Sequence, residues 1–369
     1  MATFRKKGPH QWHAQIRRKG WPQQIRTFNT QLEAKTWATM IEREMDAGVF
    51  VSRNEAEATS FASALVMYAK EVTSTKRSNT SELSRIQAMQ RHPIALRSLA
   101  SIRGSDMATY RDTRLSEGMA ASTVRRELAL ISHVFTIARK EWRMESLNNP
   151  VELIRQPSVD DARDRRIHSA DIWTYQNGNL DCERVDELEM LNRHSRSAEL
   201  PKITNFAVET GMRRSEITDL HRTNVNLDKR VAMLPITKNG SARGVPLSSK
   251  AVEVLRSQPI RDDGRFFRSR PDTITKAFAE AVGYARKAYL EGLTHLFELR
   301  IISRERIEQV ICDDTFLTDL RFHDLRLEAT TRLAEIFPLH ELTKITGHRD
   351  TRMLMRYYHP RIEDLAKKL

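Results

Sequence analysis

The 369-residue sequence predicts a mixed, mainly α-helical protein built from more than one domain. Polar and apolar residues alternate within the first 50 positions, which is typical of a small sheet. Residues 59–150 show helical periodicity without a strand signal, and short strand-like pieces then mix with long helices. We therefore expect a sheet-and-helix module at 1–55, an all-helical domain at 59–154 and an α+β domain at 163–369.

In the N-terminal module, residues 12–17 and 23–28 alternate between polar and apolar side chains, which predicts two strands around a turn at 18–22. Thr30 and Glu33 have the spacing of a capping box, so a helix is expected to begin there. The apolar residues that follow at helical spacing are Trp37, Ile41 and Met45.

Up to Gln31 this module carries seven basic residues and no acidic one. A sheet with one cationic face beside a helix is suited to binding DNA, and a solvated basic sheet is the alternative. The basic residues are Arg5, Lys6, Lys7, Arg17, Arg18, Lys19 and Arg26.

The region 59–150 is expected to form helices only, because its apolar residues recur on one face. Ser122 is expected to cap a long helix, and Asn148-Asn149-Pro150 to stop it. Residues 155–166 are polar and contain Pro157, which indicates an inter-domain linker. The apolar stripes are Phe61, Leu65, Tyr68, Ala69 and Val72, followed by Val124, Leu128, Ile131, Phe135, Ala138 and Trp142.

The last part of the chain predicts helices interrupted by three short strands. A Thr210-Gly211 turn separates two helices at 200–209 and 214–220, and Asn239-Gly240 is a hairpin turn signal. Residues 291–319 contain apolar positions typical of a packed helix, to which the sequence assigns no role. The strands are expected at 225–227, 231–235 and 244–247, and further helices near 273–290, 324–336, 339–346 and 351–358.

The charge balance favours a polyanionic partner. The chain has 61 Lys and Arg against 48 Asp and Glu, and nucleic acid is the commonest polyanion, although an ordinary basic enzyme stays open. The two cysteines, Cys182 and Cys312, support neither a disulfide framework nor a zinc ribbon. No apolar run is long enough for a membrane span, so we expect a cytoplasmic protein.

Several polar residues lie where they would not help a helix to pack. Arg213 and His348 follow turns, and Lys238 stands at the tip of a predicted hairpin. His323 and Arg326 are three residues apart, so they share one face at the start of a helix. Each residue alone has an ordinary explanation as a surface charge, a cap or a loop residue, so only the combination is informative.

In this order, and with Tyr357 after them, these residues resemble the motifs of the tyrosine recombinase (phage integrase) family. The family usually has a second histidine at the position of Leu327, but that position is outside the catalytic set. Tyr357 follows His348 by nine residues, as the family's nucleophile does. The matching motifs are T-G-M-R-R-S-E at 210–216, T-K-N-G at 237–240 with V-P-L at 245–247, H-D-L-R at 323–326 and G-H at 347–348.

The resemblance implies a three-stranded arm-binding domain, a helical core-binding domain and an α+β catalytic domain. It implies a site-specific DNA recombinase or integrase of a mobile element, which breaks and rejoins strands through a 3′-phosphotyrosyl bond without a metal or another cofactor. The implied partners are double-stranded attachment sites, three further copies of the chain in a homotetramer on synapsed DNA, and a directionality factor or DNA-bending host protein. The implied setting is a bacterial cytoplasm.

Each residue type suits this phosphoryl transfer. Arg213 and Arg326 can donate paired hydrogen bonds to the non-bridging phosphate oxygens. Tyr357 would be the nucleophile and Lys238 the general acid for the leaving 5′ oxygen. His323 is expected to assist proton transfer at the nucleophile. The two remaining expectations are a hydrogen bond from His348 to the phosphate and an orienting contact of Glu216 with Arg213.

Two other functions stay open. A type IB topoisomerase-like enzyme would use the same residue types to relax DNA. A catalytically inactive DNA-binding regulator would keep the scaffold without the reaction.

Apolar residues recur at helical spacing in the C-terminal segment 359–369. A helix this short does not hold by itself in water, so its apolar stripe must dock. It is expected to dock either onto its own domain or onto a neighbouring protomer.

Overall fold

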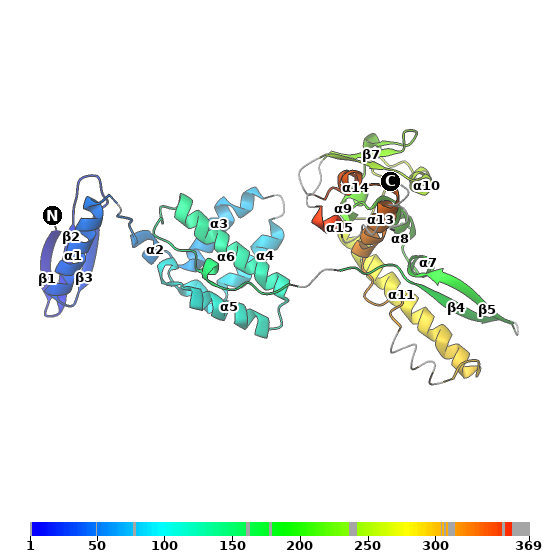
Figure 1. The fold of residues 1–369 in the computed structure, drawn as a ribbon, viewed down its shortest axis with the longest axis horizontal. Helices are drawn as coiled ribbons and strands as arrows, with labels where there is room; N and C mark the ends of the chain where they lie inside the picture. The colour runs from blue at the N-terminus through cyan, green and yellow to red at the C-terminus, as the bar shows by residue number, and fades with distance from the viewer. Residues whose placement is uncertain are drawn as a thin grey trace, which may run out of the picture. The chain divides into compact units, whose positions relative to one another are not determined.

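The computed structural model describes most of the chain (Figure 1). The described residues are 2–48, 50–76, 79–159, 163–176, 179–235, 242–303, 305, 308, 314–348 and 351–355. They fall into two compact units, Met1–Ala162 and Arg163–Leu369. The predicted mixed, mainly α fold with an N-terminal three-stranded sheet is confirmed, while the predicted three-domain boundaries stay a prediction.

The first unit begins with a three-stranded antiparallel sheet in the order β1-β2-β3. Its strands are β1 (Ala2–Gly8), β2 (Gln11–Ile16) and β3 (Gln24–Phe28), and helix α1 (Gln31–Asp46) follows. The predicted capping box is confirmed, because the Thr30 side chain accepts from Glu33 N while the Glu33 carboxylate accepts from Thr30 N. Ile16 on the sheet and Ala38, Ile41 and Met45 on α1 form one small core.

The basic residues of this module do not gather on one face, so the expected single cationic face is wrong. Residues opposite each other on antiparallel strands share a face. Arg5 pairs with His13, and His13 with Thr27, on the face away from α1. Lys6 and Arg26 lie on the other face, which α1 covers, because Arg26 pairs with the buried Ala14 and Lys6 with Trp12. Successive side chains of a strand point to opposite faces of the sheet, so basic residues that are neighbours in the sequence lie on different faces.

The rest of the first unit is helical, as predicted. Its helices are α2 (Asn54–Ala58), α3 (Phe61–Glu71), α4 (Thr80–Gln90), α5 (Gly104–Ser116) and α6 (Ala121–Glu141), with 3₁₀ turns η1 (Thr73–Thr75), η2 (Pro93–Leu96), η3 (Leu99–Ser101) and η4 (Pro150–Leu153). Phe61, Leu65 and Tyr68 from α3 pack with Leu128 and Phe135 from α6 in one buried core. The apolar stripes predicted from the sequence therefore form this core.

The predicted ends of the long helix are both wrong. Ser122 does not cap α6: the helix begins at Ala121, and the Ala120 carbonyl oxygen accepts from Thr123 N and Val124 N. The helix also ends at Glu141, well before Asn148-Asn149-Pro150, because Arg143 adopts a left-handed conformation with φ 59°. Asn149 caps η4 instead.

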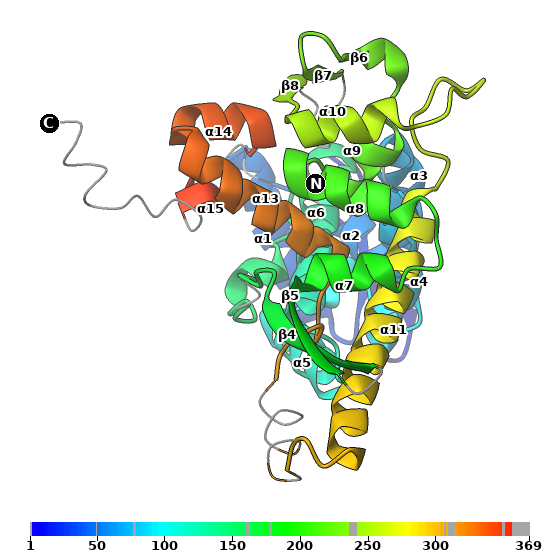
Figure 2. The same ribbon diagram turned by 90° about the vertical axis from the view of Figure 1, so that its right-hand side faces the viewer.

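In the second unit, helices α8 and α13 lie side by side at the centre of the fold (Figure 2). Its core includes Phe206 from α8, Phe278 from α11 and Leu325 from α13. Three strands in the order β6-β7-β8 form a small antiparallel sheet close to the predicted positions. The helices are α7 (Glu187–Arg193), α8 (Leu200–Thr210), α9 (Arg214–Thr218), α10 (Ser249–Arg256), α11 (Pro271–Glu298), α13 (Phe322–Ile336), α14 (Leu339–Thr346) and α15 (Arg352–Met355), with η5 (Arg222–Asn224) and strands β6 (Val225–Asn226), β7 (Val231–Leu234) and β8 (Arg243–Pro246).

The sequence did not predict helices α7 and α10 or the antiparallel hairpin of β4 (Ser169–Gln176) and β5 (Asn179–Asp186). Strand β4 contacts α11, which is longer than the predicted helix at 273–290 (Figures 1 and 2). In the described part of 291–319, the expected packed helix includes the end of α11, where Leu296 is buried and Phe297 is exposed. Asn177-Gly178 between the two strands was a usable sequence signal, since this dipeptide favours hairpin turns.

Candidate active site

Four of the six predicted catalytic residues lie in the described part of the second unit. Arg213 caps α9 just after the end of α8, and His323 and Arg326 lie in the first turns of α13. His348 directly follows Gly347, which ends α14. Helix α13 contacts both α8 and α14, so three helix ends meet here. Lys238, Tyr357 and the C-terminal segment 359–369 lie outside the described residues.

Two glycines allow these helix ends to meet. Gly211 ends α8 with φ 61°, and a Cβ there would lie 3.5 Å from the Cβ of Ala329 on α13. Gly347 ends α14 with φ 68°, and a Cβ there would lie 2.8 Å from Arg243 Nη1. Both positions need the left-handed conformation that glycine adopts without strain. The glycines of the T-G and G-H motifs are therefore required by the backbone conformation, in addition to the chemical roles expected for the neighbouring residues.

Arg326 joins the ends of α8 and α14. Its side chain is buried, and its Nη1 donates to the Gly211 carbonyl oxygen while Nη2 donates to the Thr346 carbonyl oxygen at 2.6 Å. Carbonyl groups at helix C-termini have no partner inside the helix, and the dipole there favours a cation. Arg326 is therefore fixed by the backbone segments that lead into Arg213 and His348.

Glu216 lies between two arginines. Its carboxylate accepts from the backbone N and Nη1 of Arg213, at 2.8 and 2.9 Å. It also accepts from Nη1 and Nη2 of Arg243, at 2.9 and 2.6 Å. Burial raises the pKa of this carboxyl, but the hydrogen bonds from Arg243 and Arg213 outweigh burial and hold the pKa below its ordinary value. Glu216 is therefore ionised and fixes the Arg213 side chain, the contact that the sequence analysis expected.

Arg243 is a residue of the site that the sequence analysis did not propose. It lies on β8 with its side chain buried, between Glu216 and the backbone of Gly347. Arg243 and Val245 are both buried while Gly244 between them is exposed. An arginine on the core-facing side of a strand requires a buried carboxylate, and this was the signal that could have revealed it.

His348 is held as a neutral ring. Burial, together with the positive charges of Arg326, Arg213 and Arg243, lowers its pKa to about 4. Its Nδ1 lies 2.7 Å from Thr346 Oγ1, and that hydroxyl donates its one hydrogen to the Leu342 carbonyl oxygen. Nδ1–H is therefore the donor to Thr346, and Nε2 keeps a lone pair.

His323 differs from these residues because it is exposed. It contributes to lowering the pKa of His348, as Arg213 and Arg326 do, so these three residues all lie within electrostatic reach of His348. The described strands β7 and β8 flank the segment with Lys238, and α15 ends two residues before Tyr357.

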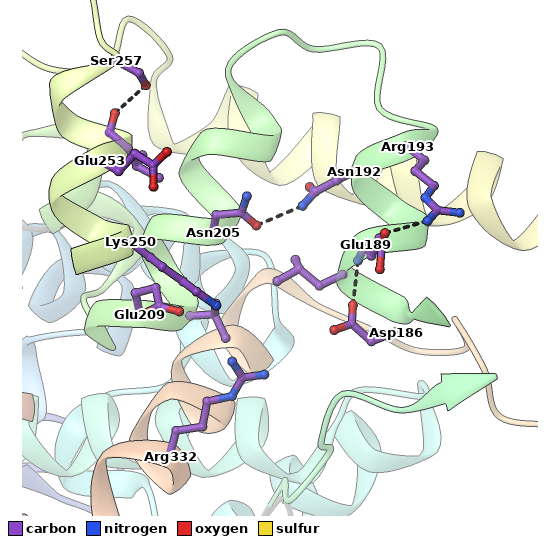
Figure 3. A pocket seen from close by; sticks show the side chains of 13 residues that line it. Asp186, Glu189, Asn192, Arg193, Asn205, Glu209, Lys250, Glu253, Ser257 and Arg332 are labelled. Atoms are coloured by element: carbon purple, nitrogen blue, oxygen red, sulfur yellow. Dashed lines mark hydrogen bonds and ion pairs between the residues drawn. The ribbon is translucent and has the colours of Figure 1, made fainter. Parts of the chain in front are cut away.

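A cavity lined by described residues lies elsewhere in the second unit (Figure 3). It has a volume of about 680 Å³, and its lining includes Asn192 and Asn205, whose side chains are hydrogen-bonded to each other, and Arg332. None of the predicted catalytic residues lines it. Within the described ranges, no group of three or more His, Cys, Asp or Glu is placed to hold a metal ion, and no helix could span a membrane.

Comparison with known proteins identifies the family. Residues 183–363 match the sequence profile of the phage integrase family. A shufflon-specific DNA recombinase of Escherichia coli is 37% identical over 321 residues, covering 84% of this chain and 71% of that protein. A putative integrase/recombinase of Haemophilus influenzae is 33% identical over 364 residues, covering 97% of this chain and 87% of that protein. A lambda integrase tetramer bound to a Holliday junction is similar in structure, with a TM-score of 0.56 and 16% identity over 94% of this chain and 97% of that chain.

Proposed function

The chain belongs to the phage integrase family of tyrosine recombinases and is a site-specific DNA recombinase, and we propose that it acts on a mobile element through a covalent bond between DNA and Tyr357. The observation that carries this assignment is the fixed group of Arg213, Arg326 and His348 at three helix ends. Their surroundings are strongly positive, since three arginines lower the pKa of His348. A phosphodiester is the natural anion for such a site.

The proposed reaction exchanges one phosphodiester bond for another. Tyr357 Oη forms a bond to the scissile phosphorus, and the bond from phosphorus to the 5′ oxygen breaks. Lys238 donates a proton to the leaving 5′ oxygen, and His323 assists removal of the proton from Tyr357. The 5′-hydroxyl of a partner strand then attacks the 3′-phosphotyrosyl bond and restores the tyrosine.

The arginines stabilise the charge that develops on the phosphate. Arg213 and Arg326 donate to its non-bridging oxygens, and both start from fixed positions, so little reorganisation is needed. A bound phosphate opposes the positive charges that lower the pKa of His348. The ring then takes a proton on Nε2 more readily and can donate it as a hydrogen bond to the phosphate.

The proposed partners are double-stranded attachment sites and three further copies of the chain. The structural similarity to a lambda integrase tetramer on a Holliday junction supports a tetramer on synapsed DNA. The exposed basic residues of the N-terminal module support arm-type DNA binding. A directionality factor or a DNA-bending host protein, and a bacterial cytoplasmic location, complete the proposal.

Trapping the covalent intermediate tests the reaction. On a duplex nicked beside the scissile phosphate, the cleaved strand end diffuses away and the phosphotyrosyl protein accumulates. Tyr357→Phe is expected to bind the DNA without forming the adduct. Tyr358→Phe is the matched control and should still form it, because in the helix that the sequence predicts at 351–358 neighbouring residues point about 100° apart. The opposite pattern would exclude Tyr357 as the nucleophile.

A second measurement separates recombination from DNA relaxation. Two differently labelled duplexes that carry the site are mixed with the protein. Exchange of labels between the duplexes is expected. Relaxation of supercoiled DNA without exchange would instead indicate a topoisomerase.

A further inference from the structure

The first described residues of the second unit carry three arginines, which all reach buried carboxylates. We call residues 163–168 the arginine segment. Arg163 and Arg166 pair with carboxylates on α13, the helix that carries His323 and Arg326, and Arg165 pairs with Glu187 at the start of α7. The sequence predicts a polar linker at 155–166, which overlaps the domain expected to begin at 163. Arg163, Arg165 and Arg166 are bound within the second unit.

Arg163 makes the most complete of these contacts. Its Nε and Nη2 donate to the two carboxylate oxygens of Asp324, at 2.5 and 2.6 Å. Asp324 Oδ2 also accepts from Arg321 N at 2.7 Å and thereby caps α13. The Asp324 side chain is 2% exposed. A buried carboxylate needs such a charged partner, so Arg163 and the first turn of α13 depend on each other.

Arg166 repeats the contact one turn later. Its Nε donates to Glu328 Oε2 at 2.8 Å, and Arg332 Nε donates to Glu328 Oε1 at 2.8 Å. The backbone N of Ile167 also points to Glu328, at 3.4 Å. Burial raises the pKa of the Glu328 carboxyl, but Arg166 and Arg332 outweigh burial and hold the pKa below its ordinary value. Glu328 is therefore ionised and held by the arginine segment.

Helical geometry places these carboxylates behind the catalytic residues. At about 100° per residue, Asp324 and Glu328 lie about 40° apart around the axis of α13. His323 and Arg326 lie about 60° apart, on a face roughly 150° away from that of the carboxylates. The arginine segment thus holds one side of the helix while the other side presents the two predicted catalytic residues.

We propose that Arg163, supported by Arg166, is a positioning residue that sets the rotation of α13 about its axis and so aims Arg326 and His323 at the scissile phosphate. This inference rests on the proposed function, because it assigns those two residues to cleavage. A small rotation of α13 moves both side chains together. Misplacement by about 1 Å can reduce a reaction rate by about 100-fold, even when the substituted residue does not touch the substrate.

The test compares cleavage at saturating DNA by the full-length wild-type protein and by Arg163→Gln. The variant is expected to form the covalent adduct about 10- to 100-fold more slowly. Its DNA affinity should stay close to that of the wild type. Its thermal unfolding midpoint should fall, because the buried Asp324 carboxylate loses its charged partner, so the two rates are compared well below the midpoint of the variant. Arg163→Lys, which keeps the charge but loses the paired geometry, should recover part of the rate.

A substrate with a neutral methylphosphonate at the scissile position distinguishes positioning from general loss of structure. This linkage carries no negative charge for an arginine to neutralise. The cleavage rate of this substrate therefore depends less on the position of Arg326. Arg163→Gln is therefore expected to lose less rate on the methylphosphonate than on the phosphodiester. An equal loss on both substrates, or no loss on either, overturns the proposal.

The control variant uses the second partner of Arg163. Its Nη1 also pairs with Asp319 at 2.6 Å, and Asp319 lies ahead of α13 and is largely exposed. Asp319→Asn should cleave like the wild type, because asparagine tolerates the left-handed backbone there (φ 47°) and the contact with Asp324 remains. A loss equal to that of Arg163→Gln would show that α13 is not the element that matters.

Two outcomes keep this proposal separate from the proposed function. If the wild-type protein forms no adduct through Tyr357, the proposed reaction fails and the positioning role falls with it. If the wild type forms the adduct and Arg163→Gln fails to fold, Arg166→Gln takes its place, since that arginine is 46% exposed. It should show a smaller loss with the same dependence on the substrate, and an unchanged rate would overturn the proposal.

Discussion

Arginines occur in two very different settings in this molecule. In the N-terminal sheet, Arg5 and Arg26 are exposed and lie on opposite faces. In the second unit, called the catalytic unit below because it carries the residues assigned to cleavage, Arg326 and Arg243 are buried, and each is fixed by hydrogen bonds to carbonyl or carboxylate oxygens. The sequence shows the positive charge of both regions equally well. In the second region, the buried arginines are held in a defined geometry by several hydrogen bonds.

The difference matters because the two settings can do different things. Exposed cations attract a polyanion over a distance and are weakened by salt. Buried cations held by fixed partners can act on charge that develops at one atom, because they need not reorganise during the reaction. We therefore expect substitutions in the catalytic unit to change rates and stability strongly, and those in the N-terminal sheet to change affinity weakly.

The largest effect is expected for the two arginines assigned to the phosphate. Arg213→Lys and Arg326→Lys should each slow covalent cleavage by about 100- to 1,000-fold while DNA binding is retained. Lysine keeps the charge but cannot donate two parallel hydrogen bonds, and at Arg326 it cannot hold both helix ends. Cleavage of a nicked duplex measures the rate. Arg214→Lys, a change in the next residue, is the control, and a wild-type rate for either test variant would contradict the assigned roles.

Arg243 should have the largest effect on stability. Arg243→Met removes two hydrogen bonds from a carboxylate that is only 7% exposed, so the free energy of unfolding is expected to fall by about 3–5 kcal/mol. Urea unfolding measures this change. Combining Arg243→Met with Glu216→Gln should recover part of the loss, because the buried charge is then gone.

The control for Arg243 is an ion pair at the surface. Arg184 and Asp171 pair on the β4–β5 hairpin with both side chains exposed. Arg184→Met should change the stability by less than about 1 kcal/mol. A similar loss from both variants would remove the distinction between buried and exposed arginines.

The sequence predicted the parts of this molecule that depend on nearby residues. The Thr30–Glu33 capping box and the Gly211 turn are local, and both are confirmed. The end of α6 could not be predicted, because a single left-handed residue, Arg143, ends the helix where the sequence shows no glycine. The β4–β5 hairpin was missed although an Asn-Gly turn signalled it.

The supporting residues of the site escaped prediction for a different reason. Arg243 pairs with Glu216 across 27 positions, and Arg163 pairs with Asp324 across 161. No local pattern connects such partners, so a polar linker and an ordinary strand were the natural interpretations. The residues assigned to chemistry were found because a family motif marks them, and their roles stay predictions.

His348 should make the free energy of unfolding depend on pH, with a smaller effect than the substitution of Arg243. Its pKa of about 4 lies below that of an unfolded histidine, so the unfolded chain binds more protons between those two values. Stability from this group is complete above about pH 6.5 and falls as the pH drops toward 4. Urea unfolding between pH 7 and 4.5 should therefore show a smaller loss for His348→Gln than for the wild type. Equal slopes would contradict a neutral, buried ring.

The smallest effects are expected for substitutions in the N-terminal sheet. They test whether DNA contacts the basic residues of one face of the sheet or of both faces. Arg5 lies on the face away from α1, with His13 and Thr27 as cross-strand neighbours. Lys6 lies on the opposite face, with its ammonium 6.0 Å from the centre of the Trp12 ring. If the open face of the sheet contacts DNA, Arg5→Gln removes a phosphate contact and Lys6→Gln does not.

The measurement is the affinity of the full-length protein for a duplex from the attachment region that lacks the cleaved site, taken at several salt concentrations. One lost phosphate contact lowers the slope of log affinity against log salt by about 0.9. Arg5→Gln should show that change, and Lys6→Gln should leave the slope nearly unchanged. Equal changes would mean that the module binds DNA through diffuse charge on both faces. No change in the slope for either variant would mean that the sheet does not contact DNA. The basic residues of the sheet would then contribute to solubility, whereas the arginines of the second unit are assigned to the reaction.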